Sequence, residues 1–242
     1  LILGIMVKKT FSKEERTELW RGLAAASLQA GDYKQTRRLC QQVSEAEPHN
    51  LQIRLLLFDL ALRANDDSGL DTILKQIHEI EGEGPYWNYG SALHLSLQAK
   101  KDKSVLSKAQ EYLARCRTMR PGWSRVPFLS AEFSLQQGNE DLATDQYLQA
   151  IDLGERSPRA IRRVLQLLYE RQRYLEANRV IRLLQEHQSP FSSELSRLAS
   201  EVSLRLDDFD RALELAQQAA KGSKDYRDHV WQADMEDVTL AA

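Results

Sequence analysis

Histidine, cysteine and paired acidic residues are the side chains of this 242-residue chain that could perform chemistry, and their spacing matches no catalytic pattern. The five histidines are scattered, without the His-Glu-x-x-His or paired-cysteine spacing that holds a metal. The sequence also lacks a glycine-rich phosphate loop and a Gly-x-Ser-x-Gly elbow. The acid pairs 66–67 and 207–208 fall in predicted turns, where acidic side chains are usually solvated. We therefore predict no enzyme activity, no metal and no cofactor.

The aromatic run at residues 86–89, Tyr-Trp-Asn-Tyr, is a further candidate for ligand binding. Its rings could form a slot for a ligand, or they could pack against neighbouring helices at the start of a helix. Packing is the more common role of aromatic residues at such a position, so we favour it.

Composition predicts a soluble helical protein. The hydrophobic fraction is 42% and the charged fraction 28%, which excludes a disordered or membrane-embedded chain. Glycine and proline number only 11 and 6, and good helix formers such as leucine, alanine, glutamine and arginine dominate. The net charge of -2 gives no general attraction to nucleic acid or to a membrane surface.

A repeat with a period of 34 residues organises the predicted helices. With Thr17 counted as position 1, five residues fall at positions 4, 7, 15, 17 and 32: Trp20, Leu23, Gly31, Tyr33 and Pro48. This pattern resembles the tetratricopeptide repeat (TPR), a helix–turn–helix element of 34 residues. Ala24 and Thr36 stand where the family usually has glycine and alanine, and both are small enough for close helix packing.

The same frame predicts an array of six repeats within residues 13–225. Their expected bounds are about 17–50, 51–84, 85–123, 124–157, 158–191 and 192–225. The third repeat is looser than the others, because Lys100-Lys101-Asp102-Lys103 lengthens the loop between its helices.

The resemblance implies an all-α fold, a right-handed α-solenoid of about six stacked antiparallel helix pairs. The residues agree with this expectation. The predicted helix that begins at Leu51 is apolar on nearly all sides, so it must be sandwiched between neighbours. Ser12 and Glu15 form a predicted capping box, and Ser157-Pro158 marks another helix start.

Both ends of the chain depart from the repeat. Residues 1–12 begin with an apolar segment, which is interpreted either as the end of a preceding core helix or as the tail of a membrane helix. The chain lacks an initiator methionine, so we expect it to be an excerpt of a longer protein. Residues 226–242 are predicted to form a terminal capping helix or a truncated repeat, with the acidic tail after Asp234 frayed.

The two cysteines, Cys40 and Cys116, lie two repeats apart in this frame. Helix layers stack roughly 8–10 Å apart, so the two backbones should be beyond the ~7 Å reach of a disulfide. We predict two reduced core thiols, which fits a reducing compartment.

The resemblance also implies where a partner would bind. In this family the first helices of successive repeats line a groove, which positions 2, 5, 9, 12 and 13 face. On this sequence the candidate peptide-binding residues are Gln52, Leu55, Asp59, Arg63, Arg125, Phe128, Glu132, Arg159, Arg162, Gln166 and Tyr169. Some family members clamp a carboxylate terminus with lysine and asparagine at positions 5 and 9 of the first repeat. Arg21 and Ala25 stand there, so we do not expect that function.

Charge is distributed unevenly along the chain. Between Glu155 and Arg182 eight arginines stand against three glutamates, whereas residues 201–242 hold ten acidic and five basic residues. The arginine-rich stretch has two interpretations: a solvated surface with internal ion pairs, or a basic patch for an acidic protein segment. Nucleic acid is not an expected partner, because the net charge is negative and few aromatic residues interleave with the basic ones.

The sequence therefore predicts a non-catalytic scaffold that binds a peptide or protein segment in the groove of a TPR-like solenoid. The alternative is a regulatory or substrate-positioning module of a larger enzyme or of a membrane-anchored protein. An RNA-binding helical repeat is a weaker option, because no base-reading residues recur at fixed positions. The expected location is cytoplasmic, with a membrane tether upstream of Leu1 as the alternative.

Overall fold

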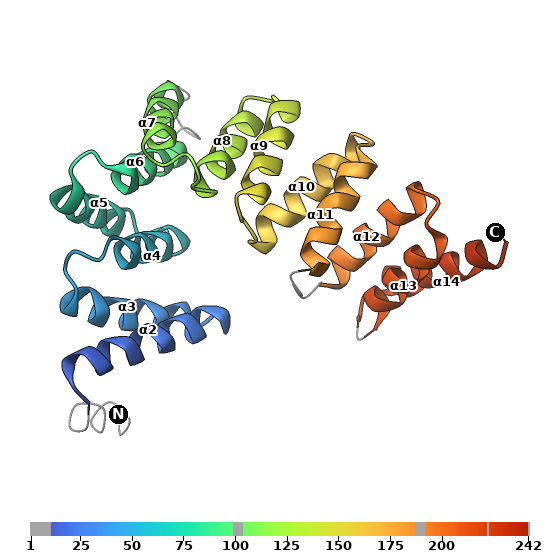
Figure 1. Ribbon diagram of the computed structural model, residues 1–242, viewed down its shortest axis with the longest axis horizontal. Coiled ribbons are helices and arrows are strands. Elements are labelled where there is room, and N and C mark those ends of the chain that lie inside the picture. Colours follow the sequence, from blue (N-terminus) through green and yellow to red (C-terminus); the bar gives the residue numbers. More distant parts are fainter. Residues whose placement is uncertain (1–10, 99–103, 187–191, 222, 242) are drawn as a thin grey trace. The chain divides into compact units, whose positions relative to one another are not determined.

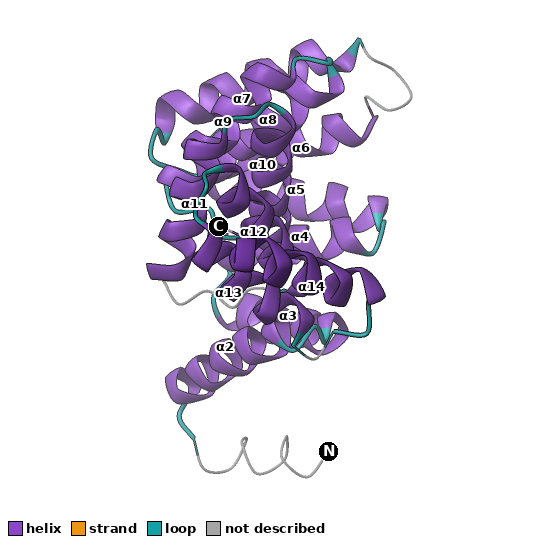
Figure 2. Ribbon diagram, turned by 90° about the vertical axis from the view of Figure 1, so that its right-hand side faces the viewer, coloured by secondary structure: helices purple, strands orange, loops and turns teal. Residues whose placement is uncertain are grey.

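The computed structural model describes residues 11–98, 104–186, 192–221 and 223–241, and in these residues all regular structure is helical (Figure 1 and Figure 2). The predicted all-α fold is confirmed. The chain divides into two compact units, Leu1–Gly122 and Trp123–Ala242, which we call the N-terminal unit and the C-terminal unit. The predicted N-terminal apolar segment at residues 1–7 and the loop-lengthening residues 100–103 lie outside the described residues.

The described residues of the N-terminal unit form three antiparallel helix pairs, which Figure 1 shows in blue to green. Within each pair the first helix packs against the second, and each later first helix also packs against the second helix of the preceding pair. The helices are α2 (Lys13–Gln29), α3 (Tyr33–Ala46), α4 (Leu51–Arg63), α5 (Asp67–Glu81), α6 (Pro85–Gln98) and α7 (Val105–Met119).

The C-terminal unit contains three further pairs and a final single helix. The helices are α8 (Arg125–Gln136), α9 (Glu140–Asp152), α10 (Pro158–Glu170), α11 (Tyr174–Glu186), α12 (Ser193–Arg205), α13 (Phe209–Ala220) and α14 (Tyr226–Ala241). Its core is rich in leucine, isoleucine and valine from α8 to α13. The predicted solenoid packing, in which neighbours share one apolar core, therefore holds within this unit.

The last helix covers the end of the array. Trp231 of α14 donates a hydrogen bond to the hydroxyl of Ser200 at 2.9 Å, and Met235 is buried against α13. The prediction that the tail after Asp234 is frayed was wrong, because α14 continues to Ala241. Apolar side chains spaced along the tail, including Met235 and Val238, give the helix a face that packs.

The turn between the two helices of a pair has the same geometry in five pairs of the described residues. One residue in each turn adopts a left-handed backbone: Gly31, Asn65, Gly138, Gln172 and Asp207, with φ between 51° and 77°. The N–H of the following residue donates to the carbonyl five residues back along the helix, as in Asp32 to Ser27 at 2.9 Å. This hydrogen bond closes a Schellman motif and ends the first helix. Gly31 and Asn65 lie 34 residues apart, as do Gly138 and Gln172, and Asp207 lies 35 residues after Gln172. The 73 residues from Asn65 to Gly138 span the third pair with its lengthened loop.

The predicted helix starts have the expected caps. Glu15 donates its N–H to the Ser12 hydroxyl at 3.2 Å, while the Glu15 carboxylate accepts the Ser12 N–H at 2.7 Å. Ser157 accepts the N–H of Ala160, and Pro158 occupies the first helical position. These local signals fix where the first and fifth pairs begin, and so help to fix the register of the array.

Both cysteines are free and fully buried, Cys40 in α3 and Cys116 in α7. Burial raises the pKa of the Cys40 thiol, and it raises the pKa of Cys116 to about 12. Each thiol is therefore held in its neutral form among apolar neighbours.

None of the described helices combines the length and the apolar character that crossing a membrane requires.

Candidate functional site

The first helices α8, α10 and α12 present a polar surface with two adjoining hollows. The larger, of about 440 Å³, lies between α8 and α10, and the smaller, of about 80 Å³, lies between α10 and α12. Arg162 and Gln166 line both hollows, so the two form one continuous surface. We call it the first-helix face; its polar residues are Glu132, Gln136, Arg159, Arg162, Arg163, Gln166, Glu194, Arg197 and Glu201.

Four of the predicted binding residues meet on this face: Glu132, Arg159, Arg162 and Gln166. Two other predicted residues, Phe128 and Tyr169, are half-buried and pack against the core instead. Phe128 meets the ring of Tyr147 edge to face at 5.6 Å, and Tyr169 meets Tyr174 in the same way at 5.6 Å. Arg125 is half-buried at the start of α8. The two aromatic side chains thus contribute to packing.

Glu132 is the most constrained acid of the first-helix face. Its carboxylate accepts two hydrogen bonds, one from the hydroxyl of Tyr147 at 2.6 Å and one from a guanidinium N–H of Arg159 at 2.6 Å. Tyr147 is buried, and this desolvation together with the neighbouring carboxylate raises its pKa far above the ordinary value. Arg159 lies on the outside of the pair, since its side chain is 74% exposed and that of Glu132 is 22% exposed.

Further ion pairs continue across the face towards α12. The guanidinium of Arg162 lies 3.1 Å from the Glu194 carboxylate. Arg197 lies 3.7 Å from Glu201 of its own helix and 3.5 Å from Asp228 of α14. Burial raises the pKa of Glu201. Arginines and acids therefore alternate over the three helices.

The residues from α12 were missed by sequence reasoning. Counting the sixth repeat from Ser192 places serines at positions 2 and 5, whereas the face uses Glu194, Arg197 and Glu201. A start at Ser193 brings these three residues to positions 2, 5 and 9. The turn at Asp207, which comes 35 residues after the preceding turn instead of 34, reflects the same one-residue shift.

The predicted residues of the N-terminal unit lie on α4 and are not equally available. Leu55 is only 5% exposed, so it packs in the core and offers no surface to a partner. Gln52 is exposed, and Asp59 is half-buried. Arg63 already contacts Tyr33: its guanidinium lies 4.5 Å from the ring centroid and donates a 3.0 Å hydrogen bond to the hydroxyl.

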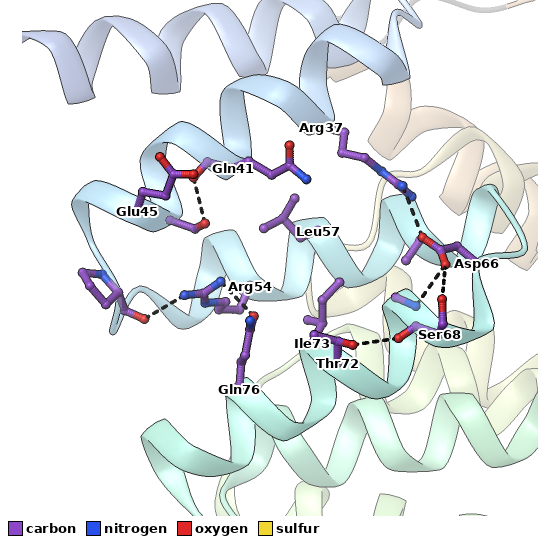
Figure 3. A pocket seen from close by; sticks show the side chains of 14 residues that line it. Arg37, Gln41, Glu45, Arg54, Leu57, Asp66, Ser68, Thr72, Ile73 and Gln76 are labelled. Atoms are coloured by element: carbon purple, nitrogen blue, oxygen red, sulfur yellow. Dashed lines mark hydrogen bonds and ion pairs between the residues drawn. The ribbon is translucent and has the colours of Figure 1, made fainter.

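A larger groove, of about 640 Å³, lies between the second helices α3 and α5 with α4 as its floor (Figure 3). Its apolar lining includes Leu57 of α4 and Ile73 of α5, and polar side chains line the rest. Most of these polar groups already pair with each other: Arg37 with Asp66 at 3.3 Å, and Arg54 with Gln76 at 2.9 Å. The groove therefore offers a partner fewer free polar groups than its size suggests.

The aromatic run 86–89 packs inside the N-terminal unit. Trp87 lies between His78 of α5 and Tyr112 of α7, with ring centroids 5.2 and 5.3 Å away. Asn88 and Tyr89 are buried. These contacts favour the packing interpretation over a ligand slot.

Several arginines of the basic stretch pair with acids of the preceding repeat. Arg171 binds Glu140 and Asp141 at 2.9 and 2.6 Å. Arg173 binds Asp145 at 2.9 Å, and Arg179 binds Asp152 at 3.0 Å. Internal ion pairing therefore accounts for Arg171, Arg173 and Arg179. The arginines of α10 on the first-helix face are exposed: Arg159 and Arg162 also form ion pairs, and for Arg163 the structure describes no carboxylate partner.

Within the described part of the chain, no group of three or more histidine, cysteine or acidic side chains is arranged to hold a metal ion.

Comparisons with known proteins agree with this architecture. Residues 27–89 match the model of a tetratricopeptide repeat family. The chain is similar to the solved structure of pilF from Pseudomonas aeruginosa, with 16% identity, a TM-score of 0.58, and coverage of 93% of this chain and 98% of that one. It is also similar to PilW, a type IV pilus biogenesis factor, with 14% identity, a TM-score of 0.53, and coverage of 84% and 91%.

A third similar structure is a chain of the Cut9–Hcn1 hetero-tetramer of APC/C, with 16% identity and a TM-score of 0.56. The match covers 77% of this chain and 35% of that one. No significant match was found among curated proteins. At these identities the likeness shows the fold, sequential antiparallel helix pairs of the TPR type, as the sequence resemblance implied.

Proposed function

Because this chain is a tetratricopeptide repeat protein, a class that generally serves in protein interaction, we propose that it binds a segment of a partner protein on its first-helix face. The partner segment is acidic, and it lies across α8, α10 and α12. The role is one of binding, without catalysis.

The observation that carries this proposal is the exposure of three arginines of α10 on the first-helix face. Arg159 reaches out past Glu132, and the side chain of Arg162 is 51% exposed. Arg163 is exposed on the same hollow. These guanidinium groups are accessible to a carboxylate from solvent, and arginine binds carboxylates through two parallel N–H donors.

Apolar side chains lie between the charges. Leu135 of α8 and Leu195 and Leu198 of α12 are half-buried and line the same hollows. A segment that alternates acidic and apolar residues would therefore bury its apolar side chains while its carboxylates reach the arginines. This combination describes the partner more narrowly than charge alone.

The test is a binding titration with a fluorescein-labelled peptide in which glutamate and leucine alternate. The charge reversal Arg159→Glu/Arg162→Glu should weaken binding about ten-fold or more, because two attractive contacts become repulsive. It should also reduce the dependence of the remaining affinity on salt concentration. A peptide with lysine in place of glutamate should not bind the unaltered protein.

The matched control is Arg179→Glu/Arg182→Glu, which makes the same charge change on the second helix α11. This control should leave the peptide affinity within about two-fold, since long-range effects between exposed charges are screened. Circular dichroism would establish that both variants remain folded. Equal loss of affinity in the two variants, or unchanged affinity with unchanged salt dependence in the first, would refute the proposed site.

A further inference from the structure

Three arginines on one side of α10 line the larger hollow of the first-helix face. They are Arg159, Arg162 and Arg163, and Gln166 follows one turn later. Residues three, four and seven positions after the first lie on the same side of a helix, so all four side chains share this side of α10. From α8 the hollow is lined by Glu132, Leu135 and Gln136. Arginine is therefore the commonest residue around the hollow.

The two adjoining hollows differ in charge. Among the described residues, three arginines and one acid, Glu132, line the larger hollow, so its net charge is +2. The smaller hollow is lined by two arginines and two glutamates and is neutral. Glu194, which pairs with Arg162, belongs to the smaller hollow and lies 3.1 Å from Nε of Arg162. The excess of positive charge is thus confined to the larger hollow.

The guanidinium groups of Arg159 and Arg163 lie beside the same tyrosine. Burial and the Glu132 carboxylate raise the pKa of Tyr147, and the positive charges of Arg163 and Arg159 both oppose this rise. Charges change the pKa of a neighbour in this way over short distances. Glu132 binds Arg159 at 2.6 Å, whereas for Arg163 the structure describes no carboxylate partner. Two guanidinium groups therefore share the space beside one hydroxyl, and one carboxylate neutralises only one of them.

A phosphate group matches this hollow better than a carboxylate does. Positive charges held close together repel each other, and a bound anion removes that repulsion. A carboxylate brings one negative charge and two oxygen atoms. A phosphorylated serine carries a charge of about −1.5 to −2 at pH 7 and three strongly accepting oxygens. It can therefore balance the net charge of the hollow and accept hydrogen bonds from three guanidinium groups at once.

We propose that the larger hollow binds a phosphoserine side chain of the partner segment, so that phosphorylation of the partner controls its attachment. This inference rests on the proposed binding role of the first-helix face. Glu132 accepts one N–H of Arg159, which leaves the other donors of that guanidinium for the phosphate. Leu135 is half-buried in the same hollow and accommodates an apolar residue next to the phosphoserine.

The surroundings of the hollow favour a peptide over a lipid surface. Gln166 lines both hollows, and Leu195 and Leu198 add apolar lining to the smaller one. A peptide lying across the three helices can place successive side chains in the two hollows. A membrane surface is broad and cannot enter a hollow between neighbouring helices.

The test compares three fluorescein-labelled peptides with the same alternating glutamate and leucine residues. They differ only at one central position, which is glutamate, serine or phosphoserine. The phosphoserine peptide should bind at least about ten-fold more tightly than the glutamate peptide, because it brings more charge and additional charge-assisted hydrogen bonds. The serine peptide should bind more weakly than either.

The pH provides a second measurement. The second pKa of a phosphate ester is about 6 and that of a glutamate side chain about 4.3, so between pH 7.5 and pH 5.5, roughly, only the phosphate gains a proton. The ratio of the two affinities should therefore fall as the pH is lowered over this range. The acids of the face, Glu132, Glu194 and Glu201, act on both peptides alike and cancel in the ratio.

Arg163→Gln is the variant that tests the assigned hollow. Its side chain is exposed, so the change should leave the fold intact, as circular dichroism would establish. The variant should bind both peptides more weakly, and its preference for phosphoserine over glutamate should drop to within about three-fold. Arg182→Gln makes the same change at an exposed residue of α11 and should keep the full preference.

The outcomes separate this inference from the proposed function. Binding of the glutamate peptide without any preference for phosphoserine overturns the inference and leaves the proposed function standing, whereas no binding of any of the three peptides overturns both. A preference that survives Arg163→Gln overturns the assigned hollow. Sedimentation with phosphatidylserine vesicles that depends on Arg163, without a preference among the peptides, would overturn the inference in favour of a lipid surface.

Discussion

Replacing Tyr147 with phenylalanine removes one hydroxyl that joins the core of the C-terminal unit to the first-helix face. The ring is buried and stays in place, so the change creates no large cavity. What is lost is the 2.6 Å hydrogen bond to the Glu132 carboxylate. Hydrogen bonds to charged groups contribute about 1.5–3 kcal/mol to the free energy of unfolding.

The structure places this case near the lower end of that range. The Glu132 side chain is partly accessible to water and keeps Arg159 as a second partner. We therefore expect Tyr147→Phe to lower the free energy of unfolding by about 1.5 kcal/mol. The loss should be accompanied by weaker peptide binding, because Glu132 and the Arg159 it orients become more mobile.

The assay is urea unfolding followed by circular dichroism, arranged as a double-mutant cycle of Tyr147→Phe and Glu132→Ala. The coupling energy between the two changes should be about 1 kcal/mol or more. Tyr112→Phe is the control, because Tyr112 contributes ring contacts in α7 and the structure describes no hydrogen bond of its hydroxyl. A coupling energy near zero, or an equal effect of Tyr112→Phe, would contradict the role assigned to the Tyr147 hydroxyl.

Three other predictions concern the turn, the thiols and the alkaline limit. Gln172→Gly should raise the free energy of unfolding by about 1 kcal/mol in urea unfolding, because Gln172 has a left-handed φ of 58° that glycine adopts without strain. Cys40 and Cys116 should resist a thiol reagent at pH 8 until urea unfolds the chain, because burial raises the pKa of both thiols, that of Cys116 to about 12. Since the pKa of Tyr147 is higher in the folded than in the unfolded state, stability should fall as the pH rises above about 10, and Tyr147→Phe should lessen this fall in a pH series of unfolding midpoints.

The helix pairs could be predicted from sequence because their signals are local and recur. Glycine or asparagine at the left-handed turn, a capping serine and a run of apolar residues each depend on neighbours within a few positions. Summed over a repeat of 34 residues, these signals locate the helices even where single positions depart from the pattern. Cys40 is such a position: it replaces an aromatic residue and is still fully buried.

The candidate site was only partly predictable, for two physical reasons. A shift of one residue in the sixth repeat turns α12 by about 100°, so counting from Ser192 selects serines instead of Glu194 and Arg197. A count of charges in the sequence also does not show which side chains form ion pairs with each other. The arginines look like one basic patch in the sequence, yet Arg171 and Arg173 are neutralised by acids of the preceding repeat.

Leu55 illustrates a third limit of position-based reasoning. Position 5 faces outward in α10, where Arg162 lies on the first-helix face, but in α4 the same position is buried. The α4 helix is apolar on most sides, and a leucine is stabilised by leaving water wherever a neighbour can cover it. The residue type thus decides whether a position lies at the surface or in the core.

The ion pairs between neighbouring repeats have a consequence for how the chain folds. Arg171 reaches acids 30 and 31 residues earlier, and Arg173 reaches one 28 residues earlier, so these tertiary links join segments close together in sequence. A chain with such a low contact order needs no long-range search and folds rapidly from any pair that forms first. Under a stretching force these ion pairs would break one repeat at a time, so that the protein would lengthen in steps.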